Sequence, residues 1–140
     1  MTTTTTRTAH ATMGFSDWQE DPAWGDDAPL PRLAQATVTF AYQGDLEATS
    51  TCRYTLSYGP DGQGSAVGFE AVDGTLHGRA GTFVLRHDAA FSATGVRYAF
   101  AVVPGSGTGE LAGLLGQGDC TADHGAEASA WELTYQLEEA

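Results

Sequence analysis

A glycine-rich segment from Pro104 to Gly118 constrains the fold of this chain more than any other part of the sequence. It holds six glycines and follows a β-type run, Val96–Val103. Glycine adds little bulk to a core, so repeated glycines indicate tight reversals, positive φ angles or close backbone approach. Residues Thr108–Leu114 can form about one helical turn, with Thr108 as N-cap and Glu110 in the first turn. The segment therefore predicts a corner between two strands.

Most of the remaining chain alternates apolar and polar side chains with a period of two, the pattern of half-buried strands. In the clearest run, Cys52 and Tyr54 share one face and Arg53 lies on the other. The expected strands are Thr8–Trp18, Arg32–Gln43, Leu46–Tyr58, Ser65–Val72, Gly81–His87, Gly95–Val103, Gln117–Ala122 and Ala128–Glu138. About eight strands with hairpin-like connections predict an all-β fold. An eight-stranded antiparallel barrel fits slightly better than a sandwich, because polar groups interrupt several apolar faces.

The composition excludes several functional classes. The 140 residues include 18 acidic and six basic side chains, which give a net charge of −12 and a pI near 4.3. Nucleic acids and anionic membranes attract basic patches, so neither is an expected partner. All six basic residues are Arg, which excludes catalysis by a Schiff-base lysine. Asn is also absent, which excludes N-glycosylation.

We expect one domain over residues 8–140, preceded by a flexible polar tail at residues 1–7. The sequence shows neither an apolar signal segment nor a run of transmembrane length, which indicates a cytoplasmic protein. In that compartment Cys52 and Cys120 are expected as buried, reduced thiols. Three prolines within Gln19–Pro31 predict a loop. Trp18 precedes this loop and Trp24 lies within it, and the two either cover a barrel mouth or hold the loop against the wall.

Glu70 and His87 are the first candidates for acid–base chemistry. Glu70 interrupts the apolar run Val67–Val72 and would suit general acid or base work if it faced the interior. A carboxylate on the solvent face is the commoner case, and it remains the alternative. His87 suits either a proton shuttle or a structural hydrogen bond. Tyr54 and Tyr98 complete the predicted catalytic set, because phenol hydroxyls on apolar faces can polarise or orient a ligand.

Aromatic side chains provide the candidate ligand-binding surface. Most aromatic residues on such faces only pack in the core. The functional hypothesis is that a subset of them lines a ligand cavity. The predicted ligand-binding residues are Trp18, Trp24, Phe40, Phe69, Phe100 and Trp131. The four histidines lack metal-ligand spacing and the two cysteines lack a CxxC motif, so neither a metal nor another cofactor is expected.

Two ordered stretches carry a family resemblance. The first runs from Phe69-Glu70 through Gly74-Thr75-Leu76 and Gly81–His87, and the second is Val103–Leu114. Together with the Trp18–Trp24 segment, they resemble a bacterial domain-of-unknown-function family that is placed with the allene oxide cyclase-like barrels. The glycine corner is also similar to a segment of plant allene oxide cyclases and dirigent proteins. This resemblance implies an eight-stranded barrel and a homo-oligomer, dimeric or trimeric. It transfers no catalytic residue to this chain.

The expected function is a cofactor-independent barrel that binds a small, largely apolar molecule. In its strongest form it is a cyclase or isomerase of specialised metabolism that holds its substrate folded in a dry cavity. Two alternatives remain open. One is a carrier or sensor that binds a ligand without chemistry, and the other is a structural oligomeric barrel with no ligand.

Overall fold

The computed structural model describes residues 3–21, 31–61, 63–92, 95–123 and 129–139. These residues form eight β-strands and one short 3₁₀ helix, η1. The elements are β1 (Thr3–Asp21), β2 (Arg32–Gly44), β3 (Leu46–Tyr58), β4 (Gly64–Leu76), β5 (Arg79–Phe91), β6 (Gly95–Val102), η1 (Gly109–Leu111), β7 (Leu115–Asp123) and β8 (Ser129–Glu139). No helix among these residues has the length and apolar character needed to cross a bilayer.

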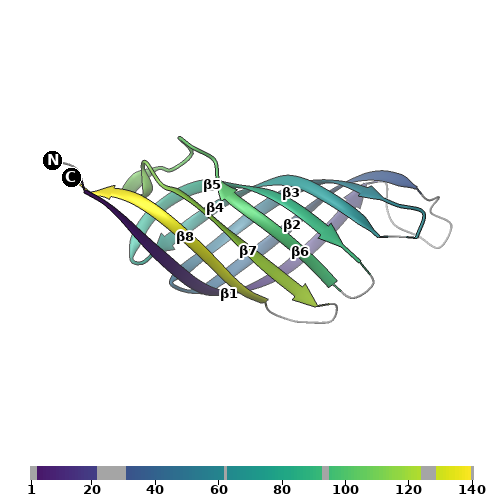
Figure 1. Ribbon diagram of the computed structural model, residues 1–140, viewed down its shortest axis with the longest axis horizontal. Helices are drawn as coiled ribbons and strands as arrows, with labels where there is room; N and C mark the ends of the chain where they lie inside the picture. Colours follow the sequence, from purple (N-terminus) through teal and green to yellow (C-terminus); the bar gives the residue numbers. More distant parts are fainter. Residues whose placement is uncertain (1–2, 22–30, 62, 93–94, 124–128, 140) are drawn as a thin grey trace.

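The strands form a closed antiparallel barrel in which each strand pairs with the next along the chain (Figure 1). β1 then pairs with β8, so the barrel has no free sheet edge. The predicted all-β, eight-stranded antiparallel barrel is confirmed. The expected strand Ser65–Val72 is too short, because β4 continues to Leu76 and the reversal falls at His77 and Gly78, both with positive φ.

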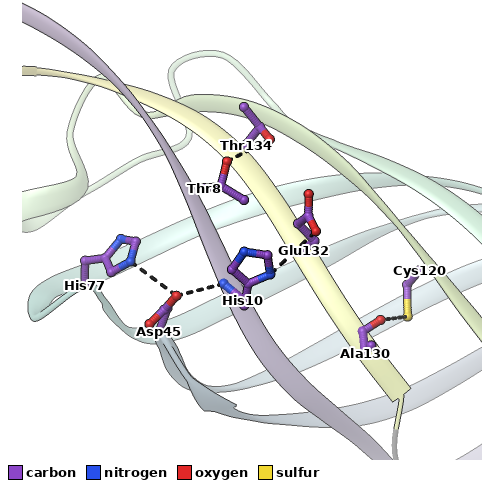
Figure 2. A network of polar contacts seen from close by, with 8 residues as sticks. All are labelled: Thr8, His10, Asp45, His77, Cys120, Ala130, Glu132 and Thr134. Carbon is purple, nitrogen blue, oxygen red and sulfur yellow. Dashed lines mark hydrogen bonds and ion pairs between the residues drawn. The ribbon is translucent and has the colours of Figure 1, made fainter.

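The β1–β8 seam closes the barrel and begins earlier in the chain than expected. Pairing extends back to Thr3, which lies opposite Glu139, so residues 3–7 form strand rather than the expected flexible tail. Further along, His10 approaches Glu132 at 3.5 Å (Figure 2). The backbone N–H of His10 donates to Asp45 in the β2–β3 turn, and His77 of the β4–β5 turn lies 3.4 Å from the same carboxylate. The seam therefore replaces an exposed strand edge with ladder and side-chain contacts.

The alternation of side chains places one face of each strand inside the barrel. The largest fully buried side chains include Trp131 and Phe83, and Cys52 and Cys120 are free and buried as expected. Three polar residues, Ser50, Glu70 and His87, are buried with the apolar core.

The glycine corner covers the part of β5 that β6 does not reach. β6 pairs with β5 only from Leu85 onward, and the corner supplies hydrogen-bond partners to the earlier β5 residues. The backbone N–H of Thr108 donates to the carbonyl of Thr82, and Glu110 accepts from the backbone N–H of Ala80 at 3.0 Å.

Leu111 and Leu114 of the corner are fully buried and join the core cluster, at the end of the barrel where both termini lie (Figure 1). The predicted helical turn is shorter than expected and covers only η1. Thr108 makes no side-chain cap, because its hydroxyl contacts Thr82 instead. The corner therefore protects the β5 backbone and fills one barrel end.

Candidate functional site

A buried carboxylate, Glu70 of β4, lies at the centre of a polar network inside the barrel. Glu70 is 0% exposed. Its Oε2 accepts hydrogen bonds from the phenol of Tyr42 on β2 and, at 2.5 Å, from the hydroxyl of Ser50 on β3. Its Oε1 lies 2.6 Å from Nε2 of His87 on β5, which is also 0% exposed. Four neighbouring strands therefore contribute to one site.

Gly68 explains how Tyr54 reaches this network. Gly68 lies between Tyr54 and His87 in the pairing register of β3, β4 and β5. A Cβ at position 68 would lie 2.9 Å from Cδ1 of Tyr54 and 2.1 Å from the carbonyl oxygen of Arg53. Without that Cβ, the Tyr54 ring crosses β4 and places its hydroxyl 2.8 Å from Nδ1 of His87.

The contacts define a direction for the hydrogen bonds. A carboxylate only accepts, so the imidazole donates its Nε2–H to Glu70 and its Nδ1 accepts from the Tyr54 hydroxyl. Burial raises the pKa of Tyr54, and burial followed by the charge of Glu70 raises the pKa of Tyr42. Both phenols therefore remain neutral donors.

Aromatic rings surround the Glu70–His87 pair. Tyr98 stacks on the His87 ring with centroids 4.8 Å apart, and Phe40 lies parallel to His87 at 6.3 Å. Phe100 stacks on Trp131 at 5.2 Å. An apolar shell of this kind strengthens electrostatic contacts at the pair and makes unpaired polar groups costly.

Two hydrogen-bond donors inside this shell are unpaired. The hydroxyl of Tyr98 and Nε1 of Trp131 are buried and have no hydrogen-bond partner within the described part of the chain. Cys120 lies between them in the strand register, and its thiol contacts the carbonyl oxygen of Ala130 at 3.2 Å. Burial raises the pKa of Tyr98, and the nearby Cys120 thiol adds to the shift although it does not lie in hydrogen-bond geometry to the phenol. Each unpaired buried donor costs about 1–3 kcal/mol, which a ligand oxygen would recover.

A second polar cluster, centred on Glu20, lies near the end of β1. Its Oε1 accepts from the hydroxyl of Tyr58 at 2.7 Å and from Nε1 of Trp18 at 3.0 Å, and Arg32 lies 3.8 Å from its Oε2. The Trp18 ring centroid is 6.2 Å from that of Tyr54. The cluster is shaped by a bulge after Ser16, where Asp17 has a φ of 58°. Trp18 therefore connects this cluster to the central network.

The structure brings together all four residues of the predicted catalytic set. Glu70, His87 and Tyr54 are joined by hydrogen bonds, and Tyr98 packs against His87. Tyr42 and Ser50, which also bind Glu70, were not among the predicted site residues. Their signal was their position on the same strand faces as the predicted aromatic residues.

The predicted ligand-binding residues do not all lie inside the barrel. Phe40, Phe100 and Trp131 lie inside the barrel, whereas Trp18 is 44% exposed beside the Glu20 cluster. Trp24 lies outside the described residues. The expectation that Phe69 lines the interior is wrong. Because adjacent strand residues face opposite sides, the inward Glu70 forces Phe69 outward, where it is 57% exposed.

Side chains from all around the barrel meet in its interior, as the Phe100–Trp131 and Tyr42–Trp131 ring contacts show. Two depressions with described linings, of about 650 and 440 Å³, lie on the outer wall. One runs over β5–β8 and the other over β1–β3. Trp18 is the most exposed of the described aromatic rings that contact the central network.

Comparisons with known proteins agree with this architecture. A crystal structure of a protein of unknown function from Shewanella oneidensis MR-1, assigned to the DUF3224 family, is similar to this chain with a TM-score of 0.72. The two are 28% identical, and the match covers 99% of this chain and 100% of that one. A search of curated proteins finds no match. The family model described as "Protein of unknown function (DUF3224)" matches residues 9–135, so the chain belongs to the DUF3224 family.

Proposed function

We propose that this barrel binds a small, largely apolar molecule and acts on it without a cofactor, as a cyclase or isomerase. The observation that carries the proposal is the Glu70–His87 pair, which is fully buried among aromatic rings and hydrogen-bonded at 2.6 Å. Burying two ionisable groups is costly for a fold, so their presence favours a role in proton transfer. The resemblance to allene oxide cyclase-like barrels supports the same class of chemistry.

The unpaired donors suggest what the ligand must carry. The hydroxyl of Tyr98 and Nε1 of Trp131 would donate to a carbonyl or ether oxygen and polarise it. The Glu70–His87 pair would then accept a proton from the activated molecule and return it at another position, which leaves the overall composition unchanged. The proposed substrate is therefore an apolar molecule with at least one acceptor oxygen. It would reach the interior past Trp18.

One observation favours a second candidate, a carrier or sensor without catalysis. The acceptor atoms of Glu70 already receive three hydrogen bonds from the protein, and both His87 nitrogens are engaged. A polar network in which every group has a partner needs no catalytic role, because it can simply specify the packing of the core.

Thermal unfolding with a panel of apolar oxygen-containing metabolites tests for binding. A ligand at about 100 times its Kd stabilises the folded state by about 2.7 kcal/mol. We expect at least one compound to raise Tm, and a Tyr98→Phe variant to lose most of that shift. A panel that leaves Tm unchanged would contradict both the enzyme and the carrier.

Turnover of a stabilising compound then separates the enzyme from the carrier. Glu70→Gln keeps the shape of the side chain but removes the carboxylate, so it should abolish product formation while the Tm shift persists. Glu47→Gln, on the exposed face of β3, is the matched control and should leave both unchanged. Equal turnover in wild type and Glu70→Gln would exclude Glu70 as the catalytic acid or base.

A further inference from the structure

An apolar ridge runs along the outer face of β4. Val67 and Phe69 are 52% and 57% exposed, and Ala71 continues the same face. Arg53 of β3 and Arg86 of β5 pair with Phe69 in the register and flank it on both sides. Two of the six arginines of this acidic chain therefore border one exposed aromatic ring. Exposed apolar side chains grouped on one strand are typical of an interaction surface.

A groove whose charged side chains are mainly acidic lies over β6, on the other side of β5 from the ridge. It is the depression of about 650 Å³ on the outer wall, and its floor is formed by Ala99 and Ala101 of β6. Three carboxylates, Asp88, Asp119 and Glu132, and one arginine, Arg86, also line the groove. The groove therefore combines two small alanines with a lining of net negative charge.

The pairing register relates the ridge to the groove. Phe69, Arg86 and Ala101 lie at one level across β4, β5 and β6. Val67, Asp88 and Ala99 lie at the next level. β5 thus runs midway between ridge and groove, so a two-fold axis along β5 would place the ridge of each copy over the groove of the other.

We propose that the ridge and the groove form a two-fold interface between two copies of this chain. Phe69 seats on Ala101 of the second copy and Val67 seats on Ala99. Arg53 comes opposite Gln117, and its long side chain reaches Asp119 at the next level of β7. Arg86 and Asp88 lie on the axis opposite their own counterparts, so each Arg86 reaches the Asp88 of the other copy at the next level of β5.

Charge complementarity favours a second copy over other occupants. Arg53, which borders the ridge, matches the carboxylates Asp119 and Glu132 that line the groove, and one chain carries both surfaces. An isologous contact uses both twice and closes on itself. Nucleic acid and anionic lipid are poor occupants because the groove lining has a net negative charge and the net charge of the chain is −12.

Sedimentation equilibrium of the full chain over a wide concentration range, at about 0.15 M salt, where the Debye length is about 8 Å, tests the proposal. We expect a monomer–dimer equilibrium for the wild type. Phe69→Ser removes the ridge and Ala101→Arg fills the groove, and each should give monomers. Leu33→Ser is the matched control, because it removes a 70% exposed leucine on β2 outside the ridge and should leave the dimer intact.

A charge exchange tests the orientation of the two copies. Arg53→Glu and Asp119→Arg should each weaken the dimer by about tenfold, and the double variant should recover most of that loss. Monomers at every concentration, assemblies larger than a dimer, or a dimer that survives Phe69→Ser would overturn the proposal. So would a double variant as weak as the two single variants. Ligand binding in the barrel interior is measured separately, so neither result decides the other.

Discussion

The hydroxyls of Tyr54 and Tyr98 are in opposite situations inside the same barrel. Both rings are buried and both contact His87. The Tyr54 hydroxyl donates to Nδ1 of His87, whereas the Tyr98 hydroxyl has no hydrogen-bond partner in the described ranges. Replacing each with Phe removes one oxygen and keeps the ring. The two variants therefore form a matched pair that measures what each hydroxyl does.

Tyr54→Phe should destabilise the protein and Tyr98→Phe should not. The first variant leaves the buried Nδ1 of His87 without a donor, at a cost of about 1–3 kcal/mol. The second removes a donor that is already unpaired, so the free energy of unfolding should stay the same or rise by up to about 1 kcal/mol. Urea unfolding of the ligand-free protein measures both. A larger loss in Tyr98→Phe would show that its hydroxyl has a partner.

Asp45 should contribute to stability in a pH-dependent way. The backbone N–H of His10 donates to its carboxylate and lowers its pKa from the ordinary value of 3.8, and His77 adds to the shift. Because the folded-state pKa is depressed, this contribution is complete above pH 3.8 and is lost as the pH falls through the folded-state pKa. Asp45→Asn should therefore unfold with a shallower pH dependence between pH 5 and pH 2, about the range over which carboxylates titrate.

Acid unfolding followed by circular dichroism measures that difference. Asp73→Asn, on the exposed face of β4, is the control and should follow the wild type. Identical curves for Asp45→Asn and wild type would mean that the turn contacts do not stabilise the fold.

Residue positions inside strands were only partly predictable from the sequence. The aromatic faces correctly placed Tyr54, Tyr98 and Trp131 inside the barrel. Glu70 and Phe69 could not both point inward, because neighbours on a strand face opposite sides. Hydrophobicity favoured Phe69 as the inward residue. The structure places Glu70 inside, because Tyr42, Ser50 and His87 satisfy its carboxylate, and those partners come from strands distant in sequence.

At the scale of elements, the glycine corner shows what local sequence can and cannot predict. The glycines correctly predicted a reversal after the strand that ends at Val102. They could not show that the reversal pairs with β5, because that contact depends on β6 being shorter than β5. Ser106 and Thr108 serve as surrogate ladder partners there, and Ser106 Oγ lies 3.0 Å from the backbone nitrogen of Val84.

Leu111→Ala should cost far more stability than Leu115→Ala. Leu111 is fully buried in the corner, whereas Leu115, at the start of β7, is 44% exposed. Removing a buried leucine side chain costs about 2–5 kcal/mol, and an exposed one costs little. Urea unfolding of the two variants measures the contrast. Equal losses would show that the corner does not seal the barrel end.

At the scale of the molecule, closure into a barrel was the least predictable feature. Alternation is the same in barrels and sandwiches, and the choice depends on the β1–β8 seam. The beginning of that seam is the threonine-rich run from Thr3 to Thr6, which carries no apolar alternation. The sequence does not predict its pairing with the last strand, because that pairing depends on the curvature of the whole sheet.

The closed barrel should also keep its tyrosines neutral beyond the pH at which they ordinarily ionise. Burial is the leading cause that raises the pKa of all five tyrosines above the usual 10.0. A raised folded-state pKa stabilises the protein fully below pH 10 and loses this contribution as the pH rises further. In native protein, tyrosinate absorbance should stay low through pH 10 and appear together with unfolding. The urea-unfolded chain should titrate near pH 10, and a native protein that titrates there too would show that the barrel interior is open to water.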